Sequence, residues 1–139
     1  MSDSENRNDL RDKTGVRVEV SDDSTRGAFA ITIAEGDDSG EVAGRTYYID
    51  RGEDRIFFHT VVDERFGGRG LGTILVREAL EATREAGGDG DNGVRTVVPI
   101  CPMVAGYLEK HGEEFAAEGG RVRAPRDEDT AAVRERARR

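Results

Sequence analysis

Alternation of hydrophobic and polar residues predicts three β-strands in the first part of the chain. Valines alternate with charged residues over 16–20, which is the period-two pattern of a strand with one buried face. The same alternation recurs over 29–33 and over 41–49, and the acidic segment 35–40 separates these two strands as a turn. Since short connections join the three strands, we expect an antiparallel meander.

The following segments predict two parallel strands joined by a helix. Residues 55–62 are apolar on both faces, which is typical of a strand in the middle of a sheet. Apolar residues then recur at helical spacing over 71–86, and Gly87-Gly88 ends this helix. A second apolar strand over 94–100 precedes a short helix over 102–110, which begins with a proline. A right-handed strand–helix–strand crossover makes its two strands parallel.

Both ends of the chain are polar. Residues 1–13 contain only two large apolar side chains, and we expect them to be disordered. Residues 119–139 form a charged, arginine-rich tail, which either stays disordered or forms a short helix from about Thr130. Between these ends we expect one α/β (α+β) domain over 14–118, with a mixed, mostly antiparallel sheet and two or more helices.

The composition and charge of the chain argue against several classes of partner. The chain has 139 residues, of which 29 are acidic and 21 basic, so its formal net charge is −8. We therefore expect neither nucleic acid nor a membrane surface as a partner. One cysteine and two histidines are too few for a disulfide or a persuasive zinc site, and we expect no metal. No apolar run is long enough to span a membrane and no signal-peptide pattern follows Met1, so we expect a cytoplasmic protein.

The junction between the central strand and its helix carries the strongest functional signal. Four glycines lie there: Gly67, Gly68, Gly70 and Gly72. Glycine accepts positive φ and lets a ligand approach the backbone closely. The first turn of the helix presents unpaired N–H groups and a positive dipole end, which bind phosphate even in an acidic protein. By itself, the pattern fits equally a flexible turn that begins a helix and a ligand-binding loop.

Two common phosphate-binding motifs do not fit this junction. A Walker A loop requires Lys and then Ser or Thr after its last glycine, whereas Gly72 is followed by Thr73 and Ile74. A dinucleotide-binding loop has glycines spaced G-x-G-x-x-G after the first strand of a Rossmann unit. Here the spacing is G-x-G-x-G, from Gly68 to Gly72, and it follows a meander.

The segment VVDERFGGRGLG (61–72) resembles motif A of the GNAT N-acetyltransferases, whose pattern is Gln/Arg-x-x-Gly-x-Gly/Ala. More narrowly, HTVV (59–62) and VPICPMV (98–104) resemble the HT-V and P-CP-V patterns of the small YidJ-type branch. The resemblance covers residues 16–115. It implies a minimal GNAT fold with a central, splayed pair of parallel strands. Gly67 departs from the pattern, because GNAT proteins usually have Gln or Arg there.

The resemblance also implies a binding mode for acetyl-CoA, the acetyl donor. In GNAT proteins the glycine loop binds the pyrophosphate, and the pantetheine arm lies between the splayed strands. Carried over to this chain, backbone groups near Val61 and Val62 would pair with the pantetheine arm. The phosphates would bind backbone amides of Gly67, Gly68, Arg69, Gly70, Leu71, Gly72 and Thr73. Arg65 and Arg69 would add charge there, or would be ordinary surface arginines.

Two residues are candidates for the chemistry. Cys101 directly precedes Pro102, near a helix N-terminus that favours a thiolate. In the YidJ-type branch the matching cysteine is proposed to lie near the acetyl thioester, and a buried core cysteine is the alternative. His59 is either a structural histidine or a general base for an amine or thiol. Tyr107 lies one position away from a tyrosine that protonates the leaving thiolate in larger GNAT enzymes, so we expect it mainly to pack.

These observations predict an acetyl-CoA-dependent N-acetyltransferase that acts on an unidentified amine of a small molecule or a protein. The alternative is a CoA- or acyl-CoA-binding module with little or no transferase activity, because the catalytic residues of larger members are missing. A weaker alternative is an adaptor whose arginine-rich tail docks a partner. The acidic composition weakly favours cationic acceptors. The sequence leaves both the acceptor and the choice between monomer and homodimer open.

Overall fold

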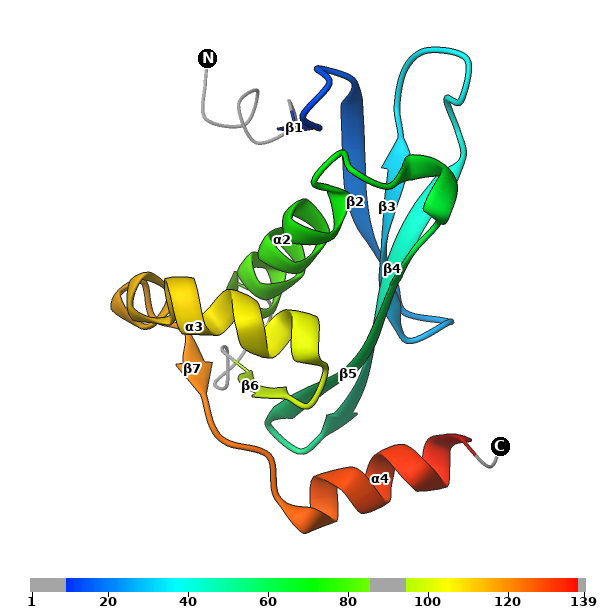
Figure 1. Ribbon diagram of the computed structural model, residues 1–139. Coiled ribbons are helices and arrows are strands. Elements are labelled where there is room, and N and C mark those ends of the chain that lie inside the picture. Colours follow the sequence, from blue (N-terminus) through cyan, green and yellow to red (C-terminus); the bar gives the residue numbers. More distant parts are fainter. Residues whose placement is uncertain (1–9, 86–94, 138–139) are drawn as a thin grey trace.

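The computed structural model describes residues 10–85 and 95–137, which form one seven-stranded mixed sheet and its helices (Figure 1). The strands are β1 (Leu10–Arg11), β2 (Arg17–Asp23), β3 (Ala28–Ile33), β4 (Val42–Arg51), β5 (Asp54–Val62), β6 (Thr96–Pro99) and β7 (Arg121–Val122). The helices are the 3-10 turn η1 (Glu64–Phe66), α2 (Leu71–Glu85), α3 (Pro102–Ala117) and α4 (Asp127–Ala137). The spatial order of the strands is their order in the sequence.

The sheet has an antiparallel and a parallel part, and both were predicted. Neighbouring strands from β1 to β5 are antiparallel, as tight turns between consecutive strands require. β5 and β6 are parallel, because α2 returns the chain between them, and β7 adds a second parallel pair. The mixed α+β class is therefore confirmed. None of the helices in the described parts of the chain is long and apolar enough to cross a membrane.

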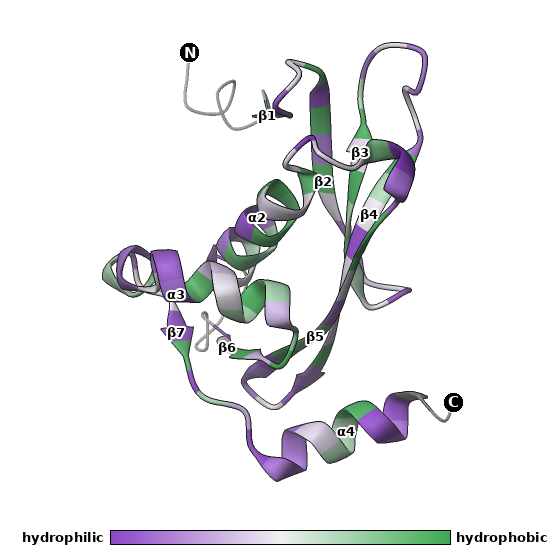
Figure 2. Ribbon diagram, viewed as in Figure 1, coloured by the Kyte–Doolittle hydropathy of each residue, from purple (hydrophilic) through white to green (hydrophobic). Residues whose placement is uncertain are grey.

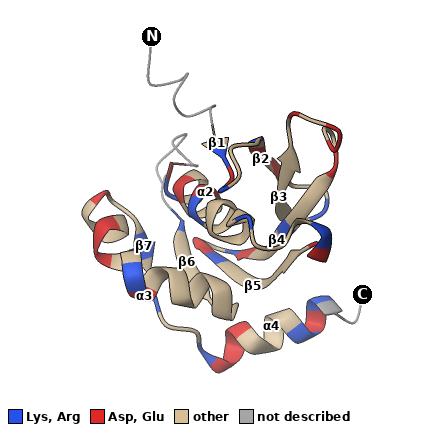
Figure 3. Ribbon diagram, turned by 45° about the horizontal axis from the view of Figure 1, so that its top comes forward, with Lys and Arg blue, Asp and Glu red and all other residues tan. Residues whose placement is uncertain are grey.

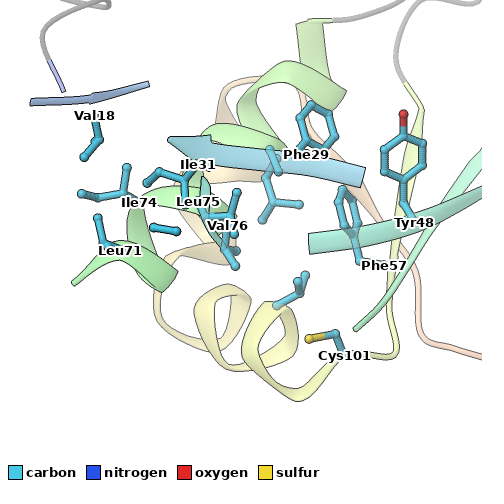
Figure 4. Packing of buried hydrophobic residues seen from close by; sticks show 14 of the residues in the cluster. Val18, Phe29, Ile31, Tyr48, Phe57, Leu71, Ile74, Leu75, Val76 and Cys101 are labelled. Carbon is cyan, nitrogen blue, oxygen red and sulfur yellow. The ribbon is translucent and has the colours of Figure 1, made fainter. Parts of the chain in front are cut away.

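The core lies between one face of the sheet and α2 (Figure 4). α2 turns its apolar residues toward the apolar face of the strands, and hydropathy colouring shows its polar residues on the other side (Figure 2). Phe29 packs against Tyr48 and Phe57, with ring centroids 5.4 and 6.3 Å away. Arg55 is buried beside them and pairs with Asp50 at 2.7 Å, so its charge is compensated.

The two later helices lie on different sides of β5 (Figure 1). α3 packs along α2 and over β5 and β6. α4 lies on the other side of β5 and reaches the turn before β3, where the guanidinium of Arg136 lies beside Gly27. Acidic residues occupy the first turn of α4 and basic residues the last, an order that the helix dipole favours (Figure 3).

The predicted end of α3 at about Lys110 is wrong. The helix continues to Ala117, through Gly112, and buries Phe115. Glycine inside a helix costs about 1 kcal/mol, which the burial of an aromatic side chain exceeds. The strand predicted over 94–100 is shorter and forms β6; Val94 and the predicted helix end at Gly87-Gly88 lie outside the described residues.

Residues 10–13 are more ordered than predicted, and the tail forms the helix that was one of its two predicted alternatives. The disorder expected for residues 1–13 does not hold for 10–13, because Leu10 packs on the core and the buried Asp12 accepts hydrogen bonds from Thr14 and Val16. Residues 1–9 lie outside the described part. The tail forms β7 and a helix that begins at Asp127 rather than Thr130.

Candidate functional site

The parallel strands separate where β6 ends. The last residue pair between them is Phe57 with Pro99, and the carbonyl of Phe57 then accepts bonds from the N–H groups of Ile100 and Cys101, at 3.0 and 2.9 Å. Beyond this point β6 turns into α3, whereas β5 continues to Val62. The end of β5 therefore has a free edge on this side.

The free edge carries the backbone groups of Thr60 and Val62. The N–H of Asp63 donates to the carbonyl of Ala43 on the β4 side, at 2.8 Å. Backbone groups alternate in direction along a strand, so Val61 also turns its N–H and C=O toward β4, where it is paired with Arg45. Of the two residues expected to offer backbone groups to a ligand, Val62 lies at the edge, and Thr60 rather than Val61 joins it.

The glycine loop follows directly from this edge. Asp63 caps η1 by accepting a bond from the N–H of Arg65, and the buried Phe66 anchors the turn in the core. Gly68 and Gly70 have φ of 80° and 77°, in the left-handed region that other residues avoid. These conformations bring the chain from η1 to the start of α2 within a few residues.

The start of α2 presents free backbone donors. Ile74 is the first residue of the helix whose N–H finds an acceptor, the carbonyl of Gly70 at 3.2 Å. The N–H groups of Leu71, Gly72 and Thr73 have none among the residues that the structure describes. The first turn of α2 also has no acidic residue. Three amides and the positive end of a helix dipole are thus available to an anion.

The loop, the β5 edge and α3 meet at Gly72. A Cβ at this position would lie 3.0 Å from Sδ of Met103, in the first turn of α3, and 3.7 Å from Cγ2 of Val62. Any larger residue at this position would therefore crowd Met103 and, through it, the start of α3. Met103 is exposed, although it lies over the loop.

Two residues near the N-terminus, Lys13 and Asp12, support the loop, and no sequence pattern predicts either contact. The N–H of Lys13 donates to the carbonyl of Arg69 at 2.9 Å, and its side chain lies against Gly70. Asp12 lies 3.5 Å from the guanidinium of Arg69. Burial would raise the pKa of Asp12, but hydrogen bonds from Thr14 and Val16 and the charge of Arg69 lower it below its usual value.

Both arginines of the loop are paired with carboxylates. Arg65 lies 3.0 Å from Glu41, and Arg69 pairs with Asp12. Both guanidinium groups also lie over the ring of Phe66, at 4.8 and 5.2 Å from its centroid. Their charges are therefore partly neutralised within the protein.

Cys101 lies at the inner end of the free edge. It precedes α3 as its N-cap residue and is only 3% exposed. Its Sγ lies 3.1 Å from the hydroxyl of Thr60, which in turn lies 2.9 Å from the hydroxyl of the fully buried Thr46. This burial agrees with the alternative of a core cysteine and does not test a role near the thioester. The two threonines form a polar chain that sequence spacing does not reveal.

His59 lies on the opposite face of the sheet from Cys101. Side chains alternate along β5, so the direction of Thr60 toward Cys101 turns His59 away from it. His59 is exposed and stacks on Tyr47, with ring centroids 6.0 Å apart. The two candidate catalytic residues are therefore not brought together, and a strand separates them.

Tyr107 lies in a hollow between α2 and α3. The hollow has a volume of 290 Å³ and is lined by Thr73 of α2 and Met103 of α3. The ring of Tyr107 lies 4.6 Å from that of His111, and burial raises the pKa of the phenol above its usual value. These contacts fit the expected packing role.

A larger hollow of 470 Å³ lies between α2 and β2, away from the glycine loop. Five carboxylates line it, those of Asp22, Glu78, Glu81, Glu85 and Glu118, against the two guanidinium groups of Arg77 and Arg84. An excess of carboxylates does not suit phosphate. In the described part of the chain, no three His, Cys, Asp or Glu side chains gather into a group that could hold a metal ion.

Comparison with known families gives one match. The sequence model of a family described as GCN5-related N-acetyl-transferase matches residues 29–117, which is more than half of the chain. No curated protein matches. The matched segment runs from β3 to the end of α3 and includes the glycine loop, the free edge of β5 and Cys101. The chain therefore belongs to the GCN5-related N-acetyl-transferases, a family of acyl-transferring proteins.

Proposed function

We propose that this protein is an acetyl-CoA-dependent N-acetyltransferase of the YidJ-type branch, with an amine of a small molecule or protein as acceptor. The observation that carries the proposal is the start of α2, where three amides lack an acceptor and adjoin the free edge of β5. A pyrophosphate linked to an extended, amide-containing arm fits this arrangement of donors.

Different residues of the chain would bind different parts of acetyl-CoA. The N–H groups of Leu71, Gly72 and Thr73 would hold the phosphates, and the preceding loop, Gly67 to Gly70, would close around them. The backbone of Val62 and Thr60 would pair with the amides of the arm. The lack of a side chain at Gly72 leaves room for Met103 beside the start of α2. Cys101 and Thr60 would then line the acyl end.

Residues on the two faces of β5 have different parts in the proposed reaction. The acceptor nitrogen attacks the thioester carbonyl carbon, a C–N bond forms, and the C–S bond breaks to release the CoA thiolate. A backbone N–H at the free edge polarises the carbonyl. His59, on the exposed face, or water takes the proton that the nitrogen loses. Cys101 shapes the acyl end from the buried face.

One observation favours the alternative of a CoA-binding module. His59 and Cys101 face opposite sides of the sheet, so neither candidate activates the other. A module would bind acetyl-CoA and CoA but transfer nothing. Release of CoA in the presence of a panel of amines and peptides separates the two functions, because rapid transfer to one acceptor excludes the module.

A matched pair of glycine variants tests the binding site. Gly68 and Gly36 have φ of 80° and 86°, and a Cβ at either position would have no atom within 4 Å. Changing either glycine to Ala therefore imposes the same backbone strain, about 1–2 kcal/mol of lost stability. Gly36 lies in the turn after β3, far from the loop in sequence.

We expect Gly68→Ala to weaken acetyl-CoA binding at least tenfold in calorimetry, because the strain displaces the loop. Gly36→Ala should leave the dissociation constant within twofold while losing similar stability in urea. If wild-type protein binds neither acetyl-CoA nor CoA, or if both variants bind like wild type, the proposed site is wrong.

A further inference from the structure

Arg45 lies on the exposed face of the sheet, where the proposed acceptor would approach. It pairs in register with Ala30 on β3 and Val61 on β5, so its side chain shares their face. Tyr47 and His59 form the next pair on that face. Val61 is 46% exposed, and Ala30 adds almost no side chain to the surface. Arg45 thus adjoins His59 diagonally across two strands.

The guanidinium of Arg45 lacks the partner that its neighbours have. Arg51, Arg55, Arg65 and Arg69 each lie within 4.0 Å of a carboxylate. Between residues 10–85 and 95–137, no carboxylate lies within that distance of Arg45. Its Nε is buried and has no hydrogen-bond acceptor. A buried donor without an acceptor is unfavourable, and a movement of the Arg45 side chain that brings Nε to a bound oxyanion would remove this cost.

The chemistry of Arg45 selects among amines. A guanidinium presents a planar fork of donors that matches a carboxylate or phosphate, and it repels an ammonium group. An acceptor whose nitrogen lies at His59 would place a neighbouring substituent near Arg45. Polyamines and lysine-rich peptides, which the acidic composition weakly favours, would bring a positive charge to this position.

We infer that Arg45 binds an anionic oxygen group of the acceptor, and that the acceptor is a small amine carrying a carboxylate or phosphate close to its nitrogen. This inference rests on the proposed function. It assigns Arg45 to acceptor selection and gives it no part in binding acetyl-CoA, whose proposed site lies at the start of α2. Failure of the inference can therefore be distinguished from failure of the proposed function.

Three pairs of amines test the inference with the full-length protein and acetyl-CoA. They are phenylalanine with 2-phenylethylamine, alanine with ethylamine, and phosphoethanolamine with ethanolamine. The first two pairs differ by a carboxylate and the third by a phosphate, so they distinguish the two oxyanions. The readout is kcat/KM from CoA release, with acetyl-CoA affinity measured separately by calorimetry.

In at least one pair we expect the anionic member to react at least tenfold better than its neutral partner. Arg45→Gln should reduce that ratio at least fivefold, and Arg45→Lys, which keeps the charge but loses the fork, should reduce it less. Arg121→Gln removes the same charge on β7 and should leave the ratio unchanged. Both Arg45 variants should bind acetyl-CoA with wild-type affinity, which also shows that they fold.

Three results overturn the inference while acetyl-CoA still binds. They are ratios near one in every pair, a preference that survives Arg45→Gln, and no transfer to any of the six amines. Loss of acetyl-CoA binding in the wild-type protein would instead overturn the proposed function, and the inference with it.

Discussion

The hydroxyl of Thr46 is buried between the sheet and its helices. The direction in which it donates its hydrogen bond determines whether Sγ of Cys101 accepts or donates one. If Thr46 donates to Thr60, then Thr60 donates to Sγ of Cys101, and both hydroxyl protons have acceptors. The reverse direction leaves the proton of Thr46 without an acceptor among the described residues. Satisfying both hydroxyl donors therefore makes the sulfur of Cys101 an acceptor, and only the weak S–H donor of this group is left without a partner in the described part of the chain.

Replacing Thr60 by Val tests this chain of hydroxyls. The change keeps the shape of the side chain but leaves the hydroxyl of Thr46 buried and unpaired, which should cost about 1–3 kcal/mol in urea unfolding. In the double variant Thr46→Val, Thr60→Val no hydroxyl is left unpaired, so its cost should be smaller than the sum of the single costs.

Thr32→Val on β3 is the control, since Thr32 is half-buried and outside this chain; it should change stability by less than about 0.5 kcal/mol. Strictly additive costs for Thr46 and Thr60 would show that their contact contributes nothing.

At the scale of elements, a cluster of charged residues attaches the start of α4 to the rest of the protein. The fully buried carboxylate of Asp129 accepts bonds from Arg123 at 2.8 and 2.9 Å and from the N–H of Arg126 at 2.7 Å. Arg123 also donates to Asp54 at the start of β5. The cluster therefore connects α4, the chain after β7 and the central strand.

The hydrogen bonds from Arg123 lower the pKa of Asp129 below its usual value, although burial opposes them. Because the folded pKa is lowered, the carboxylate stabilises the protein above its unfolded pKa of about 3.9, and this contribution is lost as the pH falls through the folded value. Asp129→Asn should lower the free energy of unfolding by about 2 kcal/mol at pH 7, a value between those typical of exposed and of buried ion pairs.

The difference between wild type and Asp129→Asn should shrink below pH 4, in unfolding experiments and in hydrogen exchange of residues 127–137. Glu128→Gln, which breaks an exposed pair with Arg126 at 3.4 Å, should change stability by less than about 1 kcal/mol at any pH. A stability difference that does not depend on pH would contradict the role of the carboxylate.

At the scale of the whole molecule, a protein with a net charge of −8 is proposed to bind a polyanion. The arginines of the loop are paired with Glu41 and Asp12, so the backbone amides of α2 supply most of the attraction. Salt screens charges on the surface much more than hydrogen bonds at a helix start, since the Debye length is about 10 Å at 0.1 M.

We therefore expect the dissociation constant of CoA to change by less than about fivefold between 50 and 300 mM NaCl in calorimetry. The side chain of Lys13 lies against Gly70, so its charge would attract a phosphate bound nearby, and salt would weaken that attraction. Salt also screens the repulsion from the acidic surface, so the two effects oppose each other. Binding that weakens tenfold or more would show that free cations, rather than amides, hold the phosphates.

Local patterns predicted the elements that build the site. The strands from β2 to β5 alternate or carry long apolar runs, and α2 has a helical period, so each could be recognised from its own residues. The glycines that need positive φ at 68 and 70 were equally local. The two-residue strands β1 and β7 are too short to show any period, and only their neighbours define them.

The remaining parts of the site depend on contacts between distant residues. Lys13 meets Gly70 across more than fifty positions, and Thr46, Thr60 and Cys101 come together from two strands and a helix start. The register of three strands places Arg45 between Ala30 and Val61, neither of which offers a carboxylate. Periodicity contains no information on such contacts, because it reports which face a residue occupies and not what lies opposite.

The bond between Lys13 and Arg69 has a thermodynamic consequence for anything bound at the start of α2. Only two residue pairs hold β1 to the sheet, so the order of the segment around Lys13 depends partly on the loop that it contacts. If a bound ligand stabilises the loop, it also stabilises the attachment of the segment around Lys13 to the loop. By reciprocity, attachment of the segment increases the affinity for the ligand by the same factor. A fusion before Leu10 that loosens the segment around Lys13 would therefore weaken binding at a site that it never touches.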